Sequence, residues 1–278
     1  MPRTTAGIRT EDRLSTAALD PAWRKWIDLV ELAVEESRQP AWSECVRFNE
    51  KRPPEAPLLH GATIRLPARA GEYVVRLADR LGIVALEAIN PVAIMHMGIE
   101  RDNSELEISD LPRPPSPVAV SPDTVALLGQ LCALPLLLNA IQKVSPEASR
   151  SWQRGYCLVC GAWPNMVEMR GIQRERRMRC GCCGSDWLLP VLHCAFCDEI
   201  DHQKLGSLLS EGDEQQVRVE TCSTCRGYLK ALFTLTTLPF TTLALKDLST
   251  VTFDLAARDR GYARPARPGW QLRVEIAQ

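Results

Sequence analysis

The sequence predicts an α+β protein in which an N-terminal α-helical domain is followed by a cysteine-rich β domain with a closing helix. Three observations lead to this prediction. Apolar residues recur at helical spacing in the part of the chain before residue 150. Short segments rich in β-branched and aromatic residues, separated by turns with Cys and Gly, follow after residue 150. Nine of the 11 cysteines lie between Cys157 and Cys225.

The composition is that of a globular protein. The 278 residues allow about two domains, and the hydrophobic content of 45% excludes wholesale disorder. The 33 basic side chains nearly balance the 34 acidic ones, which leaves a net charge of −1. This charge gives no general attraction to nucleic acid or to an anionic membrane.

The sequence shows no export signal and no membrane span. The N-terminus has basic residues but lacks the apolar core of a secretory signal. The most apolar run, residues 125–141, is interrupted by Gln130 and Pro135 and is shorter than the about 20 residues that cross a bilayer, so it is interpreted as a buried core helix. We therefore expect a cytoplasmic protein, in which cysteine pairs indicate metal or redox chemistry rather than disulfides.

Three helices are expected in the first 150 residues. After an arm at residues 1–19, Asp20 and Pro21 form the start signal of the first helix. The apolar stripe of that helix consists of Trp23, Trp26, Ile27, Val30 and Val34. The second helix is expected over residues 71–89. After a proline-rich linker at residues 100–122, the third helix begins at Ser121 and Pro122 and is kinked by Pro135.

The cysteine-rich part is expected to form β hairpins. Residues 217–220 and 228–235 have the β-branched and aromatic composition of strands. Residues 246–260 are expected to form the closing helix, although Thr250, Val251 and Thr252 lower its helix propensity.

Eight of the cysteines form four C-x-x-C pairs. The pairs are Cys157 with Cys160, Cys180 with Cys183, Cys194 with Cys197, and Cys222 with Cys225. They are separated by 19, 10 and 24 residues. Two thiolates three positions apart in a tight turn can bind one ion, and two such turns complete a tetrahedral four-sulfur shell. The first and third gaps suit hairpins, so the first two pairs are assigned to site one and the last two pairs to site two.

Glycines near the ends of these turns support the assignment. Gly161 and Gly184 directly follow their pairs, and Gly227 comes one residue later. A glycine at this point allows a positive φ and aims backbone N–H groups at the sulfurs. The alternative of a thioredoxin-like dithiol expects a βαβ setting, which the sequence lacks around these pairs.

The other cysteines and the histidines are expected to have simpler roles. Cys182, adjacent to Cys183, would make a poor chelate and is interpreted as a bystander thiol, and Cys45 and Cys132 as small core residues. His193 could support the neighbouring Cys194, but a solvated histidine is the preferred interpretation. The sequence contains no phosphate-binding glycine loop, no G-x-S-x-G and no H-E-x-x-H. We therefore expect no catalytic residues.

The chemistry of two closed four-sulfur sites leaves two questions open. Four sulfurs leave no open position for water or substrate, so each site is structural or, with iron, carries one electron. Tetrahedral four-sulfur geometry suits both zinc and iron. A basic strip of Arg170, Arg174, Arg176, Arg177 and Arg179 could bind nucleic acid, but a solvated strand or loop is the preferred interpretation.

The cysteine-rich part resembles the FdhE type of formate dehydrogenase accessory proteins. The matching stretches are residues 157–164, 179–187, 194–197 and 220–230, with the closing segment at residues 246–256 and 261–264. In the helical half the match is weak, although residues 57–59 look similar to the family. Cys182 and the basic strip depart from the family's pattern.

This resemblance implies tandem rubredoxin-like or zinc-ribbon modules. The domains are then expected at residues 1–150 (α-helical), 151–190 (first four-cysteine module) and 191–278 (second four-cysteine module with the closing helix and tail). The implied metal ligands are the eight paired cysteines, which would bind two ions of iron or zinc. They are Cys157, Cys160, Cys180 and Cys183 in site one, and Cys194, Cys197, Cys222 and Cys225 in site two.

The resemblance also implies a function. It is that of a cytoplasmic accessory protein or chaperone, not an enzyme, which binds the catalytic subunit of a respiratory formate dehydrogenase before export. The partner would bind the helical half or the interface of the two halves, and Tyr228, Leu229 and Lys230 are carried over as a possible partner surface. Rubredoxin-like electron transfer and a nucleic-acid-binding zinc ribbon are the alternatives.

Overall fold

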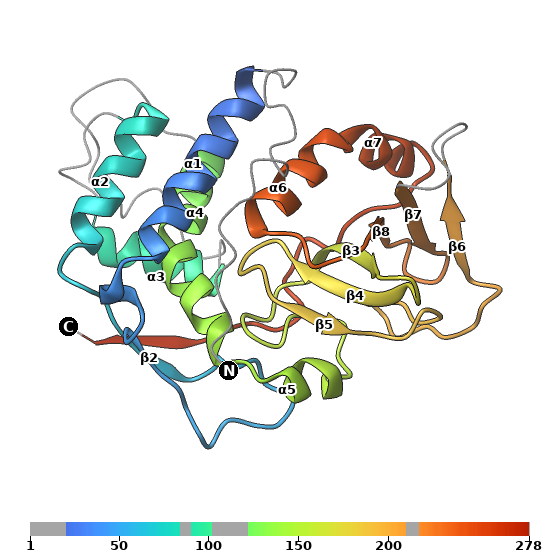
Figure 1. Ribbon diagram of the computed structural model, residues 1–278, viewed down its shortest axis with the longest axis horizontal. Coiled ribbons are helices and arrows are strands. Elements are labelled where there is room, and N and C mark those ends of the chain that lie inside the picture. Colours follow the sequence, from blue (N-terminus) through green and yellow to red (C-terminus); the bar gives the residue numbers. More distant parts are fainter. Residues whose placement is uncertain (1–20, 84–89, 102–121, 210–216, 278) are drawn as a thin grey trace.

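The computed structural model describes residues 21–83, 90–101, 122–209 and 217–277. A layer of helices lies beside a cysteine-rich sheet, and two further helices cover part of that sheet (Figure 1). The predicted α+β class is confirmed. The predicted arm at residues 1–19, the helix start at Asp20, residues 84–89 of the second helix and most of the 100–122 linker lie outside the described residues.

The helical layer consists of four helices, of which α4 forms the centre. They are α1 (Pro21–Ser37), α2 (Ala70–Leu81), α3 (Pro91–Glu100) and α4 (Pro122–Ala140). α4 is apolar around its whole circumference, as expected of a helix enclosed by its neighbours. Its extension to Lys143 gives a segment that is long and apolar enough to cross a membrane, but most of this segment is buried inside the protein.

Pro135 lies inside α4 and has a structural partner in α2. Because proline has no N–H group, the Leu131 carbonyl one turn earlier lacks its helical donor. The Tyr73 hydroxyl donates a hydrogen bond of 2.8 Å to this carbonyl. The proline that was expected to disturb the third helix therefore creates the acceptor that joins α2 to α4. Helix α3 was not predicted, and it crosses α4 closely because Gly98 faces Gly129.

A small sheet joins the helical half to the C-terminal tail. Its order is β1 (Val46–Arg47), β2 (Ala62–Arg65) and β9 (Val274–Ala277), with β2 and β9 parallel. The C-terminal tail therefore returns to the helical half (Figure 1). The sequence did not predict this sheet, because strands of two to four residues carry little periodicity.

The main sheet has six strands in the order β5-β4-β3-β8-β7-β6. The strands are β3 (Pro164–Arg170), β4 (Glu175–Cys180), β5 (Asp186–Leu188), β6 (Leu205–Leu208), β7 (Val217–Cys222) and β8 (Tyr228–Thr234). Strands β3 and β8 are parallel, with Met166 opposite Lys230. The two predicted four-cysteine modules therefore share one sheet, and the beginnings of β3 and β8, next to the cysteine turns, lie at the same end of it.

Within the described residues, three further α-helices and two short 3₁₀ helices, Pro40–Trp42 and Ile141–Lys143, are present. α5 (Pro146–Ser151) connects the helical layer to the sheet, and α6 (Phe240–Ser249) and α7 (Val251–Asp259) follow β8. The closing helix expected over residues 246–260 is thus two helices with a break at Thr250, whose hydroxyl donates to the Lys246 carbonyl. One buried core extends from the helical layer to the sheet. The domain limits at residues 150 and 190 stay a prediction.

Candidate metal centres

Site one lies at the end of the β3–β4 hairpin. Cys157 and Cys160 precede β3, whereas Cys180 ends β4 and Cys183 follows it. The four sulfurs lie within 4.8 Å of one another. Cys157 Sγ is 3.5 Å from Cys183 Sγ, and Cys160 Sγ is 3.6 Å from Cys180 Sγ. This donor set fits one ion of zinc or iron in a closed shell.

The backbone of both turns of site one is shaped around the sulfurs. Gly161 (φ 72°) and Gly184 (φ 75°) adopt the left-handed conformation that the sequence predicted. Their N–H groups donate to the carbonyls of Cys157 and Cys180 at 2.9 and 3.0 Å. The N–H groups two and three positions after Cys157 and after Cys180 approach the sulfur of that cysteine at 3.3–3.5 Å. Such donors stabilise thiolates and orient them toward an ion.

Segments from distant parts of the chain enclose site one. The N–H groups of Leu58 and Leu59 donate to the carbonyls of Leu158 and Val159, inside the first cysteine turn, at 2.7 and 3.1 Å. Residues 57–59, which looked similar to the family, thus contact the site directly. The tail contributes the N–H of Trp270, which donates to the Gly161 carbonyl at 3.0 Å. The four cysteine residues are 0–1% exposed.

Arg101, at the C-terminal end of α3, brings a positive charge to site one. Its Nη1 donates to Cys160 Sγ at 3.5 Å, and its Nη2 donates to the Cys160 carbonyl. Burial lowers the pKa of this guanidinium, but the negative charge of the Cys160, Cys182 and Cys180 sulfurs outweighs it and raises the pKa well above the usual value. Sequence analysis missed Arg101, because a single arginine 59 residues before Cys160 gives no signal.

Site two lies at the same end of the sheet, beside β7 and β8. Cys194 and Cys225 have sulfurs 3.6 Å apart, and those of Cys197 and Cys222 are 3.8 Å apart. All four lie within 4.8 Å of one another. Cys194 and Cys222 are buried, but Cys197 and Cys225 are exposed. Site two has the donor set of site one with one side open to solvent.

The turns of site two reach the left-handed conformation without glycine. The residues that directly follow the two pairs, Asp198 (φ 59°) and Arg226 (φ 58°), occupy it. The interpretation that Gly227 supplies the positive φ is therefore wrong. Gly227 serves close packing instead, because a Cβ there would lie 2.4 Å from the Phe196 ring. A short polar residue such as Asp tolerates this conformation better than most.

The sulfurs of the two sites differ in their electrostatic surroundings. At site one, hydrogen bonding from Cys157 and the other sulfurs lowers the pKa of Cys160, while burial raises the pKa of Cys180 and Cys183. At site two, burial raises the pKa of Cys225 to about 11. For Cys222, burial acts in the same direction, but the N–H groups of Cys225 and Thr224 outweigh it and lower the pKa.

Aromatic rings connect the two sites. Trp163 follows the first cysteine turn, and Phe196 lies inside the third. Their ring centroids are 5.4 Å apart in an edge-to-face arrangement, a geometry that aromatic pairs prefer. The two sites are therefore packed against each other through side chains of their own turns.

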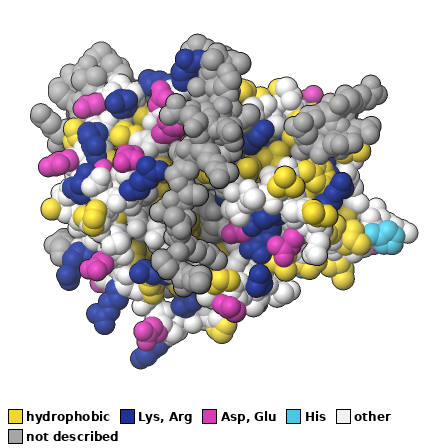
Figure 2. Space-filling model, viewed as in Figure 1, with side chains coloured by type: hydrophobic (Ala, Val, Ile, Leu, Met, Phe, Trp, Pro, Cys, Tyr) yellow, Lys and Arg dark blue, Asp and Glu magenta, His cyan; other side chains and the backbone are white. Residues whose placement is uncertain are grey.

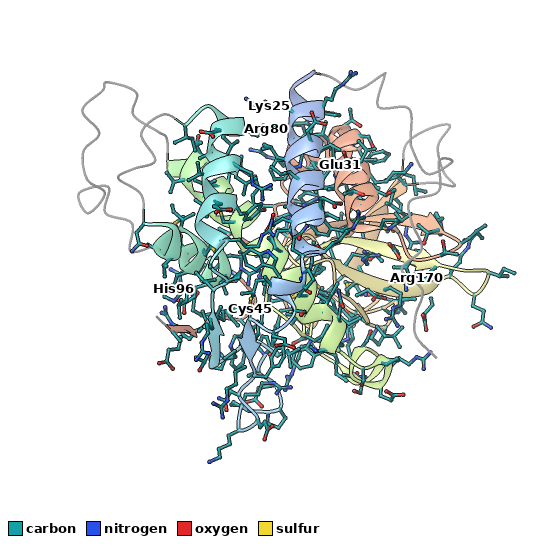
Figure 3. All side chains as sticks on the ribbon, turned by 60° about the vertical axis from the view of Figure 1, so that its left-hand side comes forward. Lys25, Glu31, Cys45, Arg80, His96 and Arg170 are labelled. Carbon is teal, nitrogen blue, oxygen red and sulfur yellow. The ribbon has the colours of Figure 1, made fainter. Side chains whose placement is uncertain are left out.

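The remaining residues singled out from the sequence lie near these sites or in the core. His193 Nε2 lies 2.9 Å from the carboxylate oxygen Oδ1 of Asp198, which accepts the hydrogen bond, so His193 contacts the residue that directly follows the third cysteine pair. Cys45 and Cys132 are buried in the core as expected, Cys45 in the helical half (Figure 3). The Tyr228–Lys230 segment is buried, so the structure does not present it as a partner surface.

The basic strip is largely neutralised inside the protein. Arg176, Arg177 and Arg179 are buried, and they pair with the carboxylates of Glu220, Asp186 and Glu168. Arg170 pairs with Glu168 and Asp186. The strip therefore lacks the row of free cations that a phosphate backbone requires.

Within the described residues, the two four-cysteine sites are the groups of His, Cys, Asp and Glu that converge as metal ligands. The fold and these sites define the class: an α+β protein that can hold two metal ions in closed four-sulfur sites. Residues 191–268, which include all four cysteines of site two, match the family described as "FdhE, C-terminal domain". This part of the chain is therefore similar to the C-terminal domain of FdhE proteins.

Part of the chain is also similar to curated FdhE homologs. The chain is 28% identical over 136 residues to a protein FdhE homolog of Aquifex aeolicus, covering 48% of the chain and 47% of the relative. It is 33% identical over 131 residues to a homolog of Haemophilus influenzae, covering 46% and 42%. The matched part is less than half the length of these relatives. The solved FdhE protein from Pseudomonas aeruginosa has a TM-score of 0.47 at 19% identity, over 90% of this chain and 93% of that one.

Proposed function

We propose that this protein is a cytoplasmic accessory protein, without enzymatic activity of its own, for the maturation of a respiratory formate dehydrogenase. The observation that carries the proposal is the match of residues 191–268, with all four site-two cysteines, to the FdhE C-terminal domain. The closed sulfur shells support it, because catalysis by a bound metal needs an open coordination position. The role is to bind the catalytic subunit of the dehydrogenase before export.

The eight paired cysteines are the proposed metal ligands, four for each ion. A metal in either site supplies cross-linking of the fold and, if it is iron, one-electron chemistry. At site one the chain holds thiolates with backbone N–H groups and with the Arg101 guanidinium. At site two it leaves Cys197 and Cys225 in contact with solvent.

The surface around site two is the proposed contact with the dehydrogenase subunit. Val191 and Leu192, just before Cys194, are 55% and 56% exposed, and Ile200 and Leu209 are exposed on the same module. Hydrophobic side chains gather on the part of the molecule formed by the cysteine-rich sheet (Figure 2). Val191 and Leu192 border a cavity of about 290 Å³. At its polar wall Arg176 and Arg218 share the single carboxylate of Glu220, which leaves a positive charge for an acidic residue of the partner.

Co-purification tests this proposal. The tagged protein is expressed with the catalytic subunit of a formate dehydrogenase from the same cells, and the subunit is expected to co-purify. Leu192→Asp should abolish co-purification, because it places a carboxylate in the apolar contact. Ile172→Asp, at a 96% exposed position on the β3–β4 turn, is the matched control. A subunit that does not co-purify, together with full dehydrogenase activity after deletion of the gene, would refute the proposal.

Electron transfer by rubredoxin-like iron is the second candidate function. The exposure of Cys197 and Cys225 favours it, because electron exchange needs a cofactor near the surface. Protein purified without oxygen is then expected to show visible ferric-thiolate absorbance that reductant bleaches reversibly. A colourless protein with two zinc ions would exclude this candidate and leave the accessory role intact.

A further inference from the structure

The main sheet ends at an uncovered edge strand. β6 pairs with β7 on one side, and no strand of the described part of the chain pairs with its other side. The strand lies at the outer end of the sheet (Figure 1). Its sequence, Leu-Gly-Ser-Leu, includes neither a charged residue nor a proline, the residues that commonly block pairing at an edge. β6 therefore has the features of a strand that another chain can extend.

The opposite edge of the same sheet is covered. Helix α5 packs against β5, and the Ser149 hydroxyl donates a hydrogen bond of 2.7 Å to the Asp186 carbonyl of that strand. The Asp186 carboxylate on β5 also pairs with Arg170 and Arg177. Of the two edges, β6 is thus the one with main-chain groups available to a further strand.

The register shows which main-chain groups of β6 point outward. The Ser223 N–H donates to the Lys204 carbonyl at 2.8 Å, so these two residues continue the β6–β7 ladder as a hydrogen-bonded pair. Hydrogen-bonded and non-hydrogen-bonded pairs alternate along an antiparallel ladder. Gly206, two residues after Lys204, therefore bonds to β7, whereas Leu205 and Ser207 direct their N–H and C=O groups away from β7. Within the described residues these four groups have no strand to bond to.

A strand added at this edge would face the cavity of about 290 Å³ described above. Ser207 lies opposite Glu220, so the side chains of both residues are on the same face of the sheet. Leu205 and Ser207 line the cavity together with Leu192. Residues of an added strand that pair with Leu205 and Ser207 point to this face as well. Every second side chain of the added strand would therefore face the cavity.

The lining of the cavity sets the chemistry of the added strand. Leu192 and Leu205 provide apolar surface. Glu220, opposite Ser207, is the single carboxylate shared by two arginines, Arg176 and Arg218, so one positive charge is in excess. The segment that fits has an apolar residue opposite Leu205 and an acidic residue two positions away, opposite Ser207.

We propose that β6 takes up an extended segment of the formate dehydrogenase catalytic subunit as a further strand of the sheet. Main-chain hydrogen bonds to Leu205 and Ser207 hold the segment, and its alternate side chains enter the cavity. The inference rests on the proposed function and deepens it. The proposed function requires that the subunit binds, and the inference states how it binds.

A proline at the outward-facing position tests this inference. Ser207→Pro removes the N–H group that the added strand needs, and proline is tolerated at an edge where the N–H faces solvent. Co-purification of the catalytic subunit with the tagged full-length protein should fall about tenfold or more, while metal content and unfolding temperature stay at the wild-type values. Ser207→Ala is the matched control, because it keeps the N–H group, and it should co-purify the subunit like the wild type.

Hydrogen exchange in the wild-type complex is a second measurement, and it decides alone if Ser207→Pro loses metal. On binding, the amides of Leu205 and Ser207 should exchange at least about tenfold more slowly, whereas the amide of Gly206, already bonded to β7, should change less. Undiminished co-purification by a folded Ser207→Pro variant, or unchanged exchange at Leu205 and Ser207 in the complex, would overturn the inference and leave the proposed function intact. A subunit that does not bind the wild-type protein would overturn both.

Discussion

Site one and site two have the same ligand motif but opposite surroundings. Site one is covered by the Leu58–Leu59 backbone, by Arg101 of α3 and by Trp270 of the tail. Site two contacts the first module through the Trp163–Phe196 ring pair, and two of its four cysteines reach the surface. The comparison shows that the C-x-x-C pairs set which sulfurs converge, while the segments packed around them decide whether a site is enclosed in the fold or open to solvent.

Removing one ligand from each site gives the largest expected difference. Cys157→Ser should lose the site-one metal and fail to form a stable helical layer, since metal binding supplies on the order of 10 kcal/mol of folding free energy in closed sites. Cys222→Ser should lose one metal ion and destabilise the protein, but the helical layer should stay folded. Metal analysis and hydrogen exchange of α4 measure the difference. Equal protection of α4 in both variants would contradict the comparison.

Thiol reactivity compares the two sites in the wild-type protein. With a chelator and an alkylating reagent, Cys197 and Cys225 should react at least about a hundredfold faster than Cys157 and Cys183, because local opening of a core costs several kcal/mol. Mass spectrometry of peptides at increasing times locates the modified residues. If Cys157 reacts as fast as Cys197, site one is not enclosed in solution.

The ion pairs of Lys230 with Asp247 and Asp254 are expected to stabilise the packing of α6 and α7 on the sheet that carries site two. Lys230 is completely buried and contacts Asp247 at 2.6 Å and Asp254 at 2.5 Å. Burial raises the pKa of Asp247, but Lys230 and Arg264 outweigh it and lower the pKa. Asp247→Asn should lower the free energy of unfolding by about 2–3 kcal/mol at pH 7. This is less than the cost of leaving a buried charge without any partner, because Lys230 keeps its contact with Asp254.

The same variant has a defined pH dependence. Because the pKa of Asp247 is lower in the folded state than its ordinary value of 3.8, its stabilisation is present above that value and is lost as the pH falls through the folded pKa. Urea unfolding of wild type and Asp247→Asn should therefore converge at acid pH. A constant difference between pH 7 and pH 3 would show that the charge of Asp247 is not the cause.

Replacing Arg101 tests whether its positive charge strengthens metal binding at site one but not at site two. Arg101→Gln should weaken metal binding at site one about 10- to 100-fold, as is typical when a hydrogen-bond partner of a ligand is removed, and leave site two unchanged. Competition with a chromogenic chelator measures both affinities. Arg226→Gln is the control, since Arg226 donates to the carbonyls of Arg260 and Gly261 rather than to a sulfur. Equal loss at both sites would indicate a general loss of stability.

The smallest effect is expected from the turn conformations. Gly161→Ala should cost about 1–2 kcal/mol, because φ is 72° and the new Cβ would lie 2.8 Å from the Trp270 carbonyl oxygen. Asp198→Gly at the corresponding position of site two should stay within about 1 kcal/mol of wild type, since relief of backbone strain and the larger entropy of the unfolded chain oppose each other. Thermal unfolding measures both changes. A destabilisation of similar size in both variants would show that the close contact with Trp270 is not what distinguishes site one.

Much of the fold could be predicted from local patterns. Helices α1 and α4 and strand β7 lie in the segments where apolar spacing and β-branched composition predicted a helix or a strand. The small sheet could not be predicted, because Ala62 and Val274 pair only after the whole chain has folded. The low helix propensity of Thr250 and its neighbours indicated a weak point in the predicted closing helix, but not that the helix would break into α6 and α7 there.

The sequence by itself determined the grouping of the cysteines, since three-residue spacing and hairpin-sized gaps permit few other four-sulfur sets. Only the tertiary structure decided which cysteines are buried and which charged or polar groups contact them. Arg101 reaches Cys160, and Trp270 reaches Gly161, across long stretches of sequence. Contacts at such separations depend on packing of the whole chain and leave no periodic signal. The same packing places Cys182 beside a cavity between the helical layer and α6.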